Sequence, residues 1–406
     1  MNILMIHPHD LYSSLEPWTI RIKNIANEFI KKGHLVKLVY FPLDKKDANR
    51  KFLDGNIEII SLDRRVGVFR LLRNIMQIVK ISGWADIIHF QKCYYYVVLP
   101  ALISAWVKNK GVHYDWDDWE TKIFYYSNPR QFLIGEFINI FEKLIPRAVD
   151  TVSVSSRQLH NLCLKRGVKP ESIFLAPVGA DLELFRPDIS QSVNIKRKYN
   201  INNRLILYLG QLHGGQYVEL FIRASRIVID NGCDATFMII GDGYRMQALK
   251  ELTKSLNVDK HIIFTGSINH NEIPFYINAA DICVACFEEN DITKCKSPLK
   301  IVEYMACGKA IVASNVGEIR SMLGGVGMLT KAGDVKSLSD SIIILLGDKE
   351  LRENLGRAAR ERVKRKYNWV VTSKNLLSAY QIAVNSAVNK NKMKGGVTSN
   401  EWKRKL

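Results

Sequence analysis

The first half of the chain alternates short apolar runs with segments of helical periodicity. Residues 2–8 (NILMIHP) are an apolar run, residues 20–33 repeat apolar positions every three or four residues, and residues 35–42 (LVKLVYFP) are apolar again. Further short apolar runs lie at 85–90, 111–116 and 150–156. Strands that alternate with helices predict a parallel sheet with helices on both faces.

A second round of the same pattern begins at residues 203–210 (NRLILYLG). Helical segments again separate apolar runs, which lie at 235–243, 261–266, 282–287 and 309–314. The second half therefore predicts a doubly wound sheet of its own. The fold class that follows is α/β, with two Rossmann-like doubly wound domains that face each other.

Composition shifts set the predicted domain boundaries. Residues 178–192 contain Gly, Pro and Asp between the two rounds and are the predicted linker. We therefore predict an N-terminal domain at 1–185, a C-terminal domain at 186–368, one more helix at 369–389, and a basic, disordered tail at 390–406. A length of 406 residues fits two domains better than one.

Composition indicates a globular protein that keeps its thiols reduced. Hydrophobic residues make up 47% of the chain, and the seven cysteines have no regular spacing. Cys283 and Cys286 form a C-x-x-C, but they lie in an apolar run that predicts core packing rather than metal or redox use. The start has no signal-peptide pattern, and the longest apolar stretch, residues 94–107, is 14 residues long, whereas a spanning helix needs about 20. We expect a cytoplasmic protein.

The formal net charge of +18 favours an anionic partner, which can be nucleic acid, anionic lipid or a phosphorylated small molecule, and the alternative is that the charge serves solubility alone. Residues 64–84 (RRVGVFRLLRNIMQIVKISGW) place basic and large apolar residues on one predicted helix. Such a helix can lie on a membrane surface, and it can equally be an ordinary surface helix of a domain. No basic-aromatic motif of a nucleic-acid-binding module is present, so we expect no nucleic-acid partner.

The stretch 297–314 (SPLKIVEYMACGKAIVAS) contains the main candidate for chemistry. Ser297 is a suitable N-cap, Pro298 suits the first helical position, and Gly308 ends the predicted helix. Free backbone N–H groups make such a helix start an anion site, and Lys300 adds a full positive charge. Glu303 is three residues further on, where its carboxylate can accept ribose hydroxyls. The hypothesis is a nucleoside diphosphate site, and the alternative is an ordinary capped helix with an exposed lysine.

Several segments together resemble family 4 glycosyltransferases, which have the GT-B fold. The 297–319 stretch resembles the donor-site helix of that family in its S-P-x-K-x-x-E variant, and PVGADLELFRP resembles the linker pattern N-G-V-D-x-x-x-F-x-P. GHLVKLV, LILYLGQL, FMIIGDG, IIFTGSINHNEIPFYINAADI and NLGRAARERVKRKYNW follow the family in order. The resemblance covers most of residues 1–380 and is weaker before Asp150.

The resemblance implies an enzyme that transfers a sugar from a nucleotide donor, with retention at the anomeric carbon and without a metal or another cofactor. It also implies that the C-terminal domain binds the donor, that the N-terminal domain binds the acceptor, and that the final helix crosses back to the first domain. Ligands of open α/β sheets bind beyond the carboxyl ends of the strands. The expected donor-binding residues are Gly210, Gln211, Gly214, Gly215, Gly241, Gly266, Ser297, Pro298, Lys300 and Glu303.

The chain departs from the family pattern at the expected phosphate site. The family often has a Glu eight positions before the one matched by Glu303, and this chain has Cys295 there. Gln211 and Gln216 stand where the family often has Arg and Lys. Charge-assisted hydrogen bonds are about twice as strong as neutral ones, so these changes weaken the expected hold on the diphosphate. The backbone amides of Gly214 and Gly215 offer a partial substitute.

In the first domain, HYDWDDWE resembles the Y-D-x-H-E loop of the family. Asp115 matches its Asp, Asp117 its His and Asp118 its Glu. By this resemblance Asp117 and Lys300 are the expected catalytic residues, with Asp117 accepting a proton or orienting the acceptor. The alternative is that the loop carboxylates cap the next helix. The expected acceptor-binding residues are Glu16, Trp18, Asp115 and Asp118.

Two functions from different classes remain open at this stage. The first is a retaining glycosyltransferase of surface polysaccharide or glycan biosynthesis, which acts on a saccharide acceptor, lipid-linked, at the inner face of the plasma membrane. The second is a catalytically weak GT-B protein that serves as a binding or scaffold subunit of a membrane glycosylation complex. Gln211, Gln216 and Cys295 motivate the second function.

Overall fold

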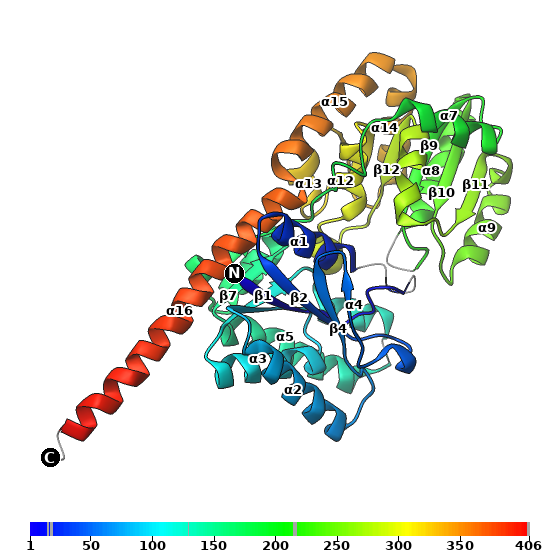
Figure 1. Cartoon of the computed structure of the whole chain (residues 1–406). Coiled ribbons are helices and arrows are strands. Elements are labelled where there is room, and N and C mark those ends of the chain that lie inside the picture. The colour runs from blue at the N-terminus through cyan, green and yellow to red at the C-terminus, as the bar shows by residue number, and fades with distance from the viewer. Residues whose placement is uncertain (14–15, 17–18, 129, 214–216, 404–406) are drawn as a thin grey trace. The chain divides into compact units, whose positions relative to one another are not determined.

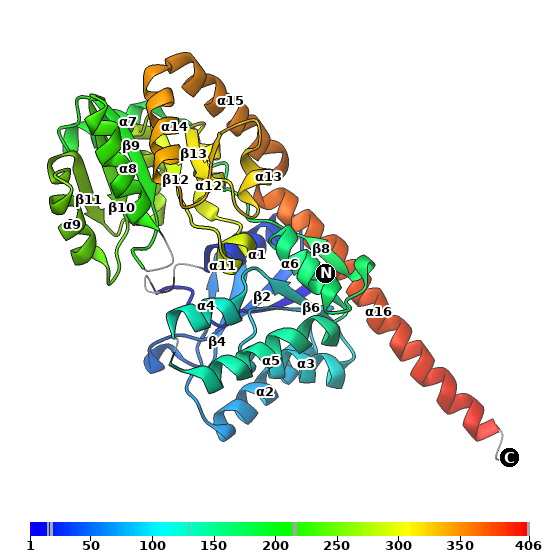
Figure 2. The same ribbon diagram turned by 180° about the vertical axis from the view of Figure 1, so that it is seen from behind.

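The computed structural model describes residues 1–13, 16, 19–128, 130–213 and 217–403, with the side chains of 189–192 and 392–403 excepted. The chain divides into two compact units, and each is described here by itself. The N-terminal unit comprises Met1–Pro177 together with Thr372–Leu406, and the C-terminal unit comprises Val178–Val371. Figures 1 and 2 show a layered α/β arrangement in each unit.

The N-terminal unit has an eight-stranded sheet in the order β3-β4-β2-β1-β5-β6-β7-β8. Every neighbouring pair is parallel except β3 and β4, which are antiparallel. The strands are β1 (Asn2–Ile6), β2 (Leu35–Tyr40), β3 (Lys51–Asp54), β4 (Ile57–Ser61), β5 (Ile87–Gln91), β6 (Gly111–Trp116), β7 (Thr151–Val154) and β8 (Ile173–Leu175).

Helices cover both faces of this sheet. They are α1 (Ile20–Lys31), α2 (Val68–Ser82), α3 (Tyr95–Lys108), α4 (Glu120–Ser127), α5 (Phe132–Ala148), α6 (Arg157–Lys165) and α16 (Trp369–Lys403), with short 3₁₀ helices η2 (Lys45–Asp47) and η3 (Pro170–Ser172). Helices α2, α3 and α5 lie side by side on one face (Figures 1 and 2). On the opposite face α16 packs next to α1, where the Tyr380 and Phe29 ring centroids are 5.4 Å apart.

The C-terminal unit has a fully parallel six-stranded sheet in the order β11-β10-β9-β12-β13-β14. The strands are β9 (Arg204–Leu209), β10 (Ala235–Ile240), β11 (Ile262–Gly266), β12 (Ile282–Ala285), β13 (Ala310–Ser314) and β14 (Met328–Thr330). The helices are α7 (Ile189–Lys198), α8 (Val218–Asp230), α9 (Met246–Ser255), α10 (Ile273–Ala279), α11 (Asp291–Cys295), α12 (Leu299–Ala306), α13 (Ile319–Leu323), α14 (Val335–Gly347) and α15 (Lys349–Lys366), with 3₁₀ helices η5 (Asp259–His261) and η6 (His270–Glu272).

The sequence-based prediction of two doubly wound α/β domains is confirmed. Cys283 and Cys286 are free and buried, and they belong to separate apolar clusters of the C-terminal unit. The expected core role of the C-x-x-C pair therefore holds for both thiols. Within the described residues, none of the helices has the length and apolar character that a membrane crossing requires.

The unit boundaries differ from the predicted ones by a few residues. The structure divides the chain after Pro177 rather than after residue 185, because Ala180 and Phe185 are buried in the core of the C-terminal unit. Helix α16 continues to Lys403, through the predicted disordered tail. Glycine lowers helix stability by about 1 kcal/mol per residue, so the two glycines of the tail do not by themselves end a helix.

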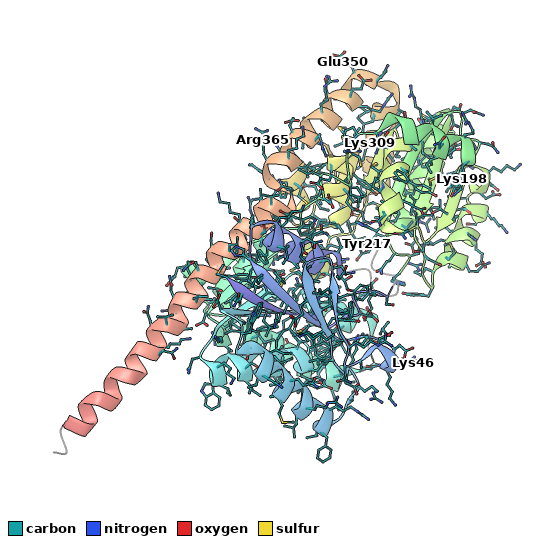
Figure 3. The ribbon with its side chains drawn as sticks, viewed as in Figure 1. Lys46, Lys198, Tyr217, Lys309, Glu350 and Arg365 are labelled. Atoms are coloured by element: carbon teal, nitrogen blue, oxygen red, sulfur yellow. The ribbon has the colours of Figure 1, made fainter. Side chains whose placement is uncertain are left out.

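Basic side chains are spread over both units rather than confined to one element. Lys46 in the N-terminal unit and Lys198 and Arg365 in the C-terminal unit are all exposed (Figure 3). The net charge of the chain therefore does not mark one binding surface by itself, and local charge patterns decide where an anion can bind.

Glycines bring the carboxyl ends of β9, β10 and β11 close together. Gly210 donates its N–H to Ile240 O at 2.9 Å, and Gly241 donates its N–H to Gly266 O at 3.0 Å. Gly241 has φ of 141°, and a Cβ atom there would lie 1.9 Å from the carbonyl oxygen of Gly210. Only glycine therefore fits at position 241 without moving the β9 terminus.

We expect Gly241→Ala to lower the free energy of unfolding of the C-terminal unit by about 1–3 kcal/mol from backbone strain alone, and the clash of the added Cβ should lower it further. Gly232→Ala is the matched control, since Gly232 also has positive φ, 76°, but nothing lies within 4 Å of the added Cβ. Urea unfolding of both variants measures the difference. Equal destabilisation would show that crowding at position 241 is unimportant.

Candidate active site

Helix α12 begins differently from the sequence-based prediction. Pro298, with φ −72° and ψ 121°, is the N-cap residue, and no side chain caps the first turn. The prediction that Ser297 is the N-cap and Pro298 the first helical residue is therefore wrong. A residue before proline is pushed into extended backbone, and the Ser297 hydroxyl instead accepts a hydrogen bond from the Val178 N–H at 3.4 Å.

The Lys300 ammonium is buried without a hydrogen-bond partner among the described residues. The side chain as a whole is only partly buried, so the burial concerns its charged end. Its Nζ atom lies 4.5 Å from the ring centroid of Tyr208 and 5.7 Å from that of Phe287. A Cβ atom on Gly210 would lie 2.6 Å from Nζ, so the ammonium lies directly at the carboxyl end of β9.

Burial, together with the nearby charge of Lys296, lowers the pKa of Lys300 to about 8, against the opposing effects of Cys286 and Glu303. A desolvated ammonium without a hydrogen-bond acceptor is unfavourable. An anion placed between Gly210 and the start of α12 would supply that acceptor. No side chain caps the first turn of α12, so its start can offer further N–H donors to such an anion, although the Ile301 N–H already bonds to the Pro298 carbonyl at 3.2 Å.

Glu303 is one turn further along α12 and is 3% exposed. Its Oε1 lies 2.8 Å from Nε2 of His270, the first residue of η6. Burial opposes protonation of His270, but the hydrogen bond and charge of Glu303 and the charge of Asp181 raise its pKa above the ordinary histidine value. His270 therefore donates to the carboxylate and fixes its direction.

Sequence reasoning missed His270. The available signal was its place just after β11, at the carboxyl end of a parallel strand, in the segment SINHNEIP. Asn269 before it caps η6 by accepting the N–H of Asn271, which sets the turn that carries the imidazole. Only the tertiary structure places that imidazole beside Glu303.

The other expected donor residues have different surroundings. Gln211 follows Gly210. The next residue, Leu212, donates its N–H to the carbonyl oxygen of Asp242, which follows β10, at 2.9 Å. A Cβ on Gly266 would meet nothing within 4 Å. Cys295, at the position of the missing Glu, is buried in α11. Gly214, Gly215 and Gln216 lie outside the described residues.

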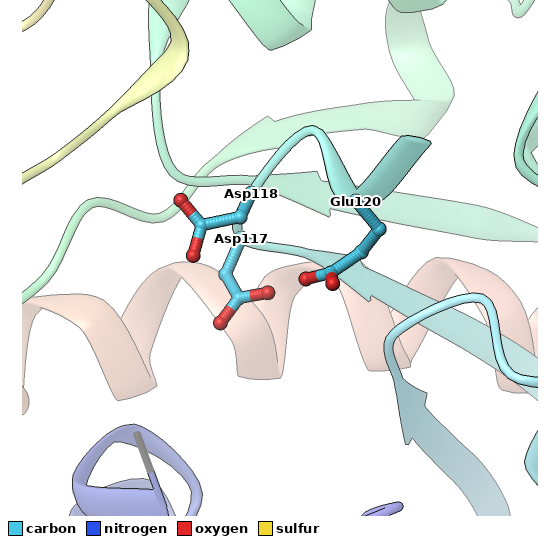
Figure 4. Close-up of side chains that lie close together, drawn as sticks. All are labelled: Asp117, Asp118 and Glu120. Atoms are coloured by element: carbon cyan, nitrogen blue, oxygen red, sulfur yellow. The ribbon is translucent and has the colours of Figure 1, made fainter. Parts of the chain in front are cut away.

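In the N-terminal unit, three carboxylates surround the buried ammonium of Lys92 at the ends of β5 and β6. Its Nζ lies 2.8 Å from Asp117 Oδ1, 3.5 Å from Asp118 Oδ2 and 2.5 Å from Glu120 Oε1. Figure 4 shows the three carboxylates close together, with Asp117 and Asp118 on the loop that follows β6 and Glu120 at the start of α4. Their oxygens lie within 4.8 Å of one another, a spacing that a metal ion could use. The Lys92 ammonium already neutralises part of this charge.

The pKa values in this cluster follow from burial and mutual repulsion. Burial would lower the pKa of Lys92, but Asp117, Glu120 and Asp118 raise it well above the ordinary lysine value. Burial, with the charges of Asp118 and Asp117, raises the pKa of Glu120 to about 7 in spite of Lys92. Burial also raises the pKa of Asp117. Asp117 and Glu120 are therefore poised to exchange a proton more readily than ordinary carboxylates.

Asp115 is not placed to contact an acceptor. Its carboxylate is fully buried and accepts two hydrogen bonds from Arg21, each 2.8 Å long, and one from Ser153. Burial would raise the pKa of Asp115, but the Arg21 charge holds it far below its usual range. The expectation of direct acceptor binding by Asp115 is therefore corrected, because its oxygens are used inside the unit.

Glu16 is also buried, with its carboxylate bonded to His9 Nδ1 at 3.0 Å, to the Asp10 N–H at 2.6 Å and to Arg64 at 2.9 Å. Burial opposes ionisation, but the hydrogen bonds from His9 and Asp10 and the interaction with Arg64 lower the pKa of Glu16 to about 2. The charged Glu16 carboxylate thus joins His9 and Asp10, which follow β1, to Arg64. Trp18 lies outside the described residues.

The alternative role for the loop carboxylates, capping of the next helix, is wrong. The buried Glu142 of α5 caps α4 instead, because it accepts the N–H groups of Glu120 and Thr121 at 2.9 and 3.1 Å. No side chain at the N-cap position of α4 forms a cap. Glu142 was not recognisable from the sequence, since it lies more than twenty residues further along the chain.

Comparison with known proteins assigns the C-terminal unit. The sequence profile described as "Glycosyl transferases group 1" matches residues 191–362. Over these residues the chain is similar to the group 1 glycosyltransferases. Lys300, Glu303 and His270 lie within the matched residues, whereas the Lys92 cluster lies outside them.

Individual relatives agree with this assignment at low identity. The chain is 25% identical over 201 residues to N-acetyl-alpha-D-glucosaminyl L-malate synthase of Bacillus anthracis, which covers 48% of this chain and 49% of that protein. It is 27% identical over 251 residues to sulfoquinovosyl transferase SQD2 of Arabidopsis thaliana, and the match covers 60% of this chain and 46% of that protein. The chain thus spans about half the length of these curated relatives.

Solved structures extend the likeness to nearly the whole chain and identify the fold as GT-B. Sucrose-phosphate synthase of Thermosynechococcus elongatus gives a TM-score of 0.72 at 19% identity, with 94% of this chain and 98% of that one covered. Anabaena Alr3699/HepE in complex with UDP-glucose gives 0.70 at 18% identity, covering 95% and 99%.

We expect nucleoside diphosphate binding to weaken as the pH rises through about 8, the pKa of Lys300. The diphosphate binds the protonated ammonium, so affinity is full below this pKa and falls up to about tenfold per pH unit above it. Titration calorimetry with UDP and GDP in buffers of different ionisation enthalpy should show proton uptake near pH 8. Lys300→Met should abolish the uptake, and a pH-independent affinity would contradict the assignment.

We expect Lys92→Met to lower the free energy of unfolding of the N-terminal unit by about 3 kcal/mol at pH 8, because three neighbouring carboxylates lose their counter-charge. The deficit should shrink at pH 6, since Glu120, with a pKa of about 7, then becomes protonated. Urea unfolding followed by tryptophan fluorescence measures both values. The exposed Lys108→Met is the control, and an equal effect of both substitutions would refute a special role of Lys92.

Proposed function

We propose that this protein is a retaining glycosyltransferase. It moves a sugar from a nucleotide-diphosphate sugar to a saccharide acceptor that is lipid-linked and belongs to surface polysaccharide or glycan biosynthesis. The observation that carries the proposal is the buried Lys300 ammonium, without a hydrogen-bond acceptor, beside Gly210 at the uncapped start of α12. We expect the enzyme to act at the inner, cytoplasmic face of the plasma membrane.

In this proposal, Lys300 and the first-turn amides of α12 hold the diphosphate of the donor. Negative charge grows on the diphosphate as the bond to the sugar breaks, and a preorganised ammonium in a desolvated place stabilises that charge strongly. This arrangement requires no metal or other cofactor, since the chain supplies the positive charge. The solved complex of Anabaena HepE with UDP-glucose supports this type of donor for a related fold.

Glu303 is proposed to accept hydrogen bonds from the ribose hydroxyls of the donor. Its Oε1 is held by His270 at 2.8 Å, so His270 acts as a positioning residue. A carboxylate whose direction is fixed before binding loses less conformational entropy when the nucleotide arrives.

Asp117 is proposed to orient the acceptor hydroxyl or to accept its proton. The raised pKa values of Asp117 and Glu120 suit a proton-accepting role near neutral pH. Asp118 is the most exposed of the cluster, with 34% of its side chain accessible, and is proposed to contact the acceptor. In this scheme Lys92 keeps the three carboxylates together.

The second candidate function is a GT-B binding or scaffold subunit with weak catalysis. The specific observation is Cys295, a buried thiol at the position where the family often has a carboxylate. Calorimetry separates the two functions. Absence of binding for every nucleoside diphosphate and nucleotide sugar in a panel would favour the scaffold function.

We expect Lys300→Met and Glu303→Gln each to lower turnover by more than about tenfold, because each removes a charge from the donor site. The melting temperature should not fall, and that of Lys300→Met should stay the same or rise, because this substitution removes a desolvated charge. Turnover is measured by mass spectrometry of products formed from a panel of nucleotide sugars and lipid-linked acceptors.

The matched control is Lys294→Met. Lys294 lies six residues before Lys300, is partly exposed and pairs with Glu289. The control should keep full turnover. A parallel loss of thermal stability and turnover in the Lys300 and Glu303 variants would indicate a structural role instead.

A further inference from the structure

The outward surfaces of α2, α3 and α5 carry an unusual number of exposed apolar side chains. These helices are neighbours on one face of the N-terminal sheet (Figures 1 and 2). We call this surface the α2–α5 face and define it by its exposed apolar residues: Phe69, Leu72, Met76, Trp106, Leu133, Phe137, Ile140 and Leu144.

On α2 the exposed apolar residues form one stripe. Phe69, Leu72 and Met76 follow at helical spacing, and the ring of Phe69 is 88% exposed. The buried residues of the same helix are Asn74, Ile78 and Ser82. The helix is thus apolar on its outer side, which is the reverse of an ordinary surface helix.

Helix α5 repeats this arrangement. Leu133, Phe137, Ile140 and Leu144 are spaced so that they lie along one side of the helix, and Leu133 is 83% exposed. Its buried positions include Gly135, Glu142 and Ile145. Singly exposed apolar residues need no explanation, but stripes of them on neighbouring helices favour a binding surface.

Charge identifies the kind of partner. Residues 64–84 contain five basic residues and no acidic one. Arg70, Arg73 and Lys80 of α2 are exposed beside the apolar stripe, as is Lys143 of α5. The acidic residues of α5 are engaged, because Glu136 bonds to Tyr125 and Asn139, and Glu142 caps α4.

We propose that the α2–α5 face binds an anionic lipid bilayer, with the apolar side chains entering the interface and the basic ones contacting lipid head groups. Exposed apolar and basic residues on the same helices fit such a surface. A second copy of the chain fits less well, because a two-fold contact would bring basic residues against the same basic residues. Nucleic acid would leave the apolar stripes without a partner.

This inference gives a physical partner to the lipid-linked acceptor proposed above, but it does not depend on sugar transfer. Membrane binding and transfer are measured separately, so failure of one leaves the other standing. If the chain binds vesicles but transfers no sugar, the membrane-binding surface is supported and the proposed enzyme activity is contradicted. If the chain transfers sugar but does not bind vesicles, the activity is supported and the membrane-binding surface is contradicted.

The test is co-sedimentation of the full chain with vesicles of phosphatidylcholine alone or mixed with phosphatidylglycerol. We expect binding only to the anionic vesicles and weaker binding at higher salt. An apolar variant, Phe69→Ser with Leu133→Ser, and a charge variant, Lys80→Gln with Lys143→Gln, should each bind at least about tenfold more weakly.

The matched control, Ile344→Ser with Lys366→Gln, removes an exposed apolar residue and an exposed lysine from the C-terminal unit and should bind like the unchanged chain. Melting temperatures of all variants test for intact folding, which is expected because the replaced side chains are exposed.

Three outcomes would overturn the proposal. The unchanged chain could fail to bind anionic vesicles, or folded variants could bind as well as the unchanged chain. Sedimentation velocity could also show a dimer that the apolar variant dissociates, which would assign the α2–α5 face to a second copy instead.

Discussion

A single desolvated ammonium is the physical feature on which the proposed donor site of the C-terminal unit depends. The Lys300 nitrogen lies between aromatic rings and a strand end that lacks side chains, and it has no hydrogen-bond acceptor among the described residues. Keeping a charge in such a place costs free energy that folding must supply elsewhere. The parallel-sheet core provides that free energy, and the proposed diphosphate ligand would recover it on binding. In the proposed site, the burial that weakens the free protein would therefore strengthen recognition.

The parallel sheet explains why this place exists. In a doubly wound unit all strands end on the same edge, so loops that are distant in sequence converge there. Gly210, Gly241 and Gly266 end three neighbouring strands, and their small size lets the backbone segments approach within hydrogen-bonding distance. The same topology brings His270, which follows β11, to Glu303 on α12. Neither residue could hold its geometry on an isolated helix or loop.

The N-terminal unit uses the same edge for another kind of charge. Lys92 after β5 and the three carboxylates after β6 form a cluster in which one buried ammonium interacts with three carboxylates. Arg21 with Asp115 and Glu16 with Arg64 add two further ion pairs in this unit. Buried pairs of this kind stabilise less than apolar packing would, but they fix side chains in one arrangement. This rigidity suits the proposed role of the cluster in orienting an acceptor hydroxyl.

Much of the fold and part of the site followed from the sequence alone. Apolar periodicity was sufficient to predict two α/β domains, because strands and helices have different repeat lengths. The placement of Lys300 and Glu303 one turn apart on one helix was predictable for the same local reason.

Tertiary packing decided the rest. Ser297 is not the predicted N-cap residue of α12, because a residue before proline is pushed into extended backbone. Asp115 matches a site residue of the resembled family, but its carboxylate is bonded to Arg21 inside the unit. Glu142 caps a helix that begins more than twenty residues away in sequence. His270 and Lys92 gained their partners through the order of strands in the sheets. Spacing along a chain determines which side chains share a face of one element, but only the folded sheet determines which elements meet and which charges become buried.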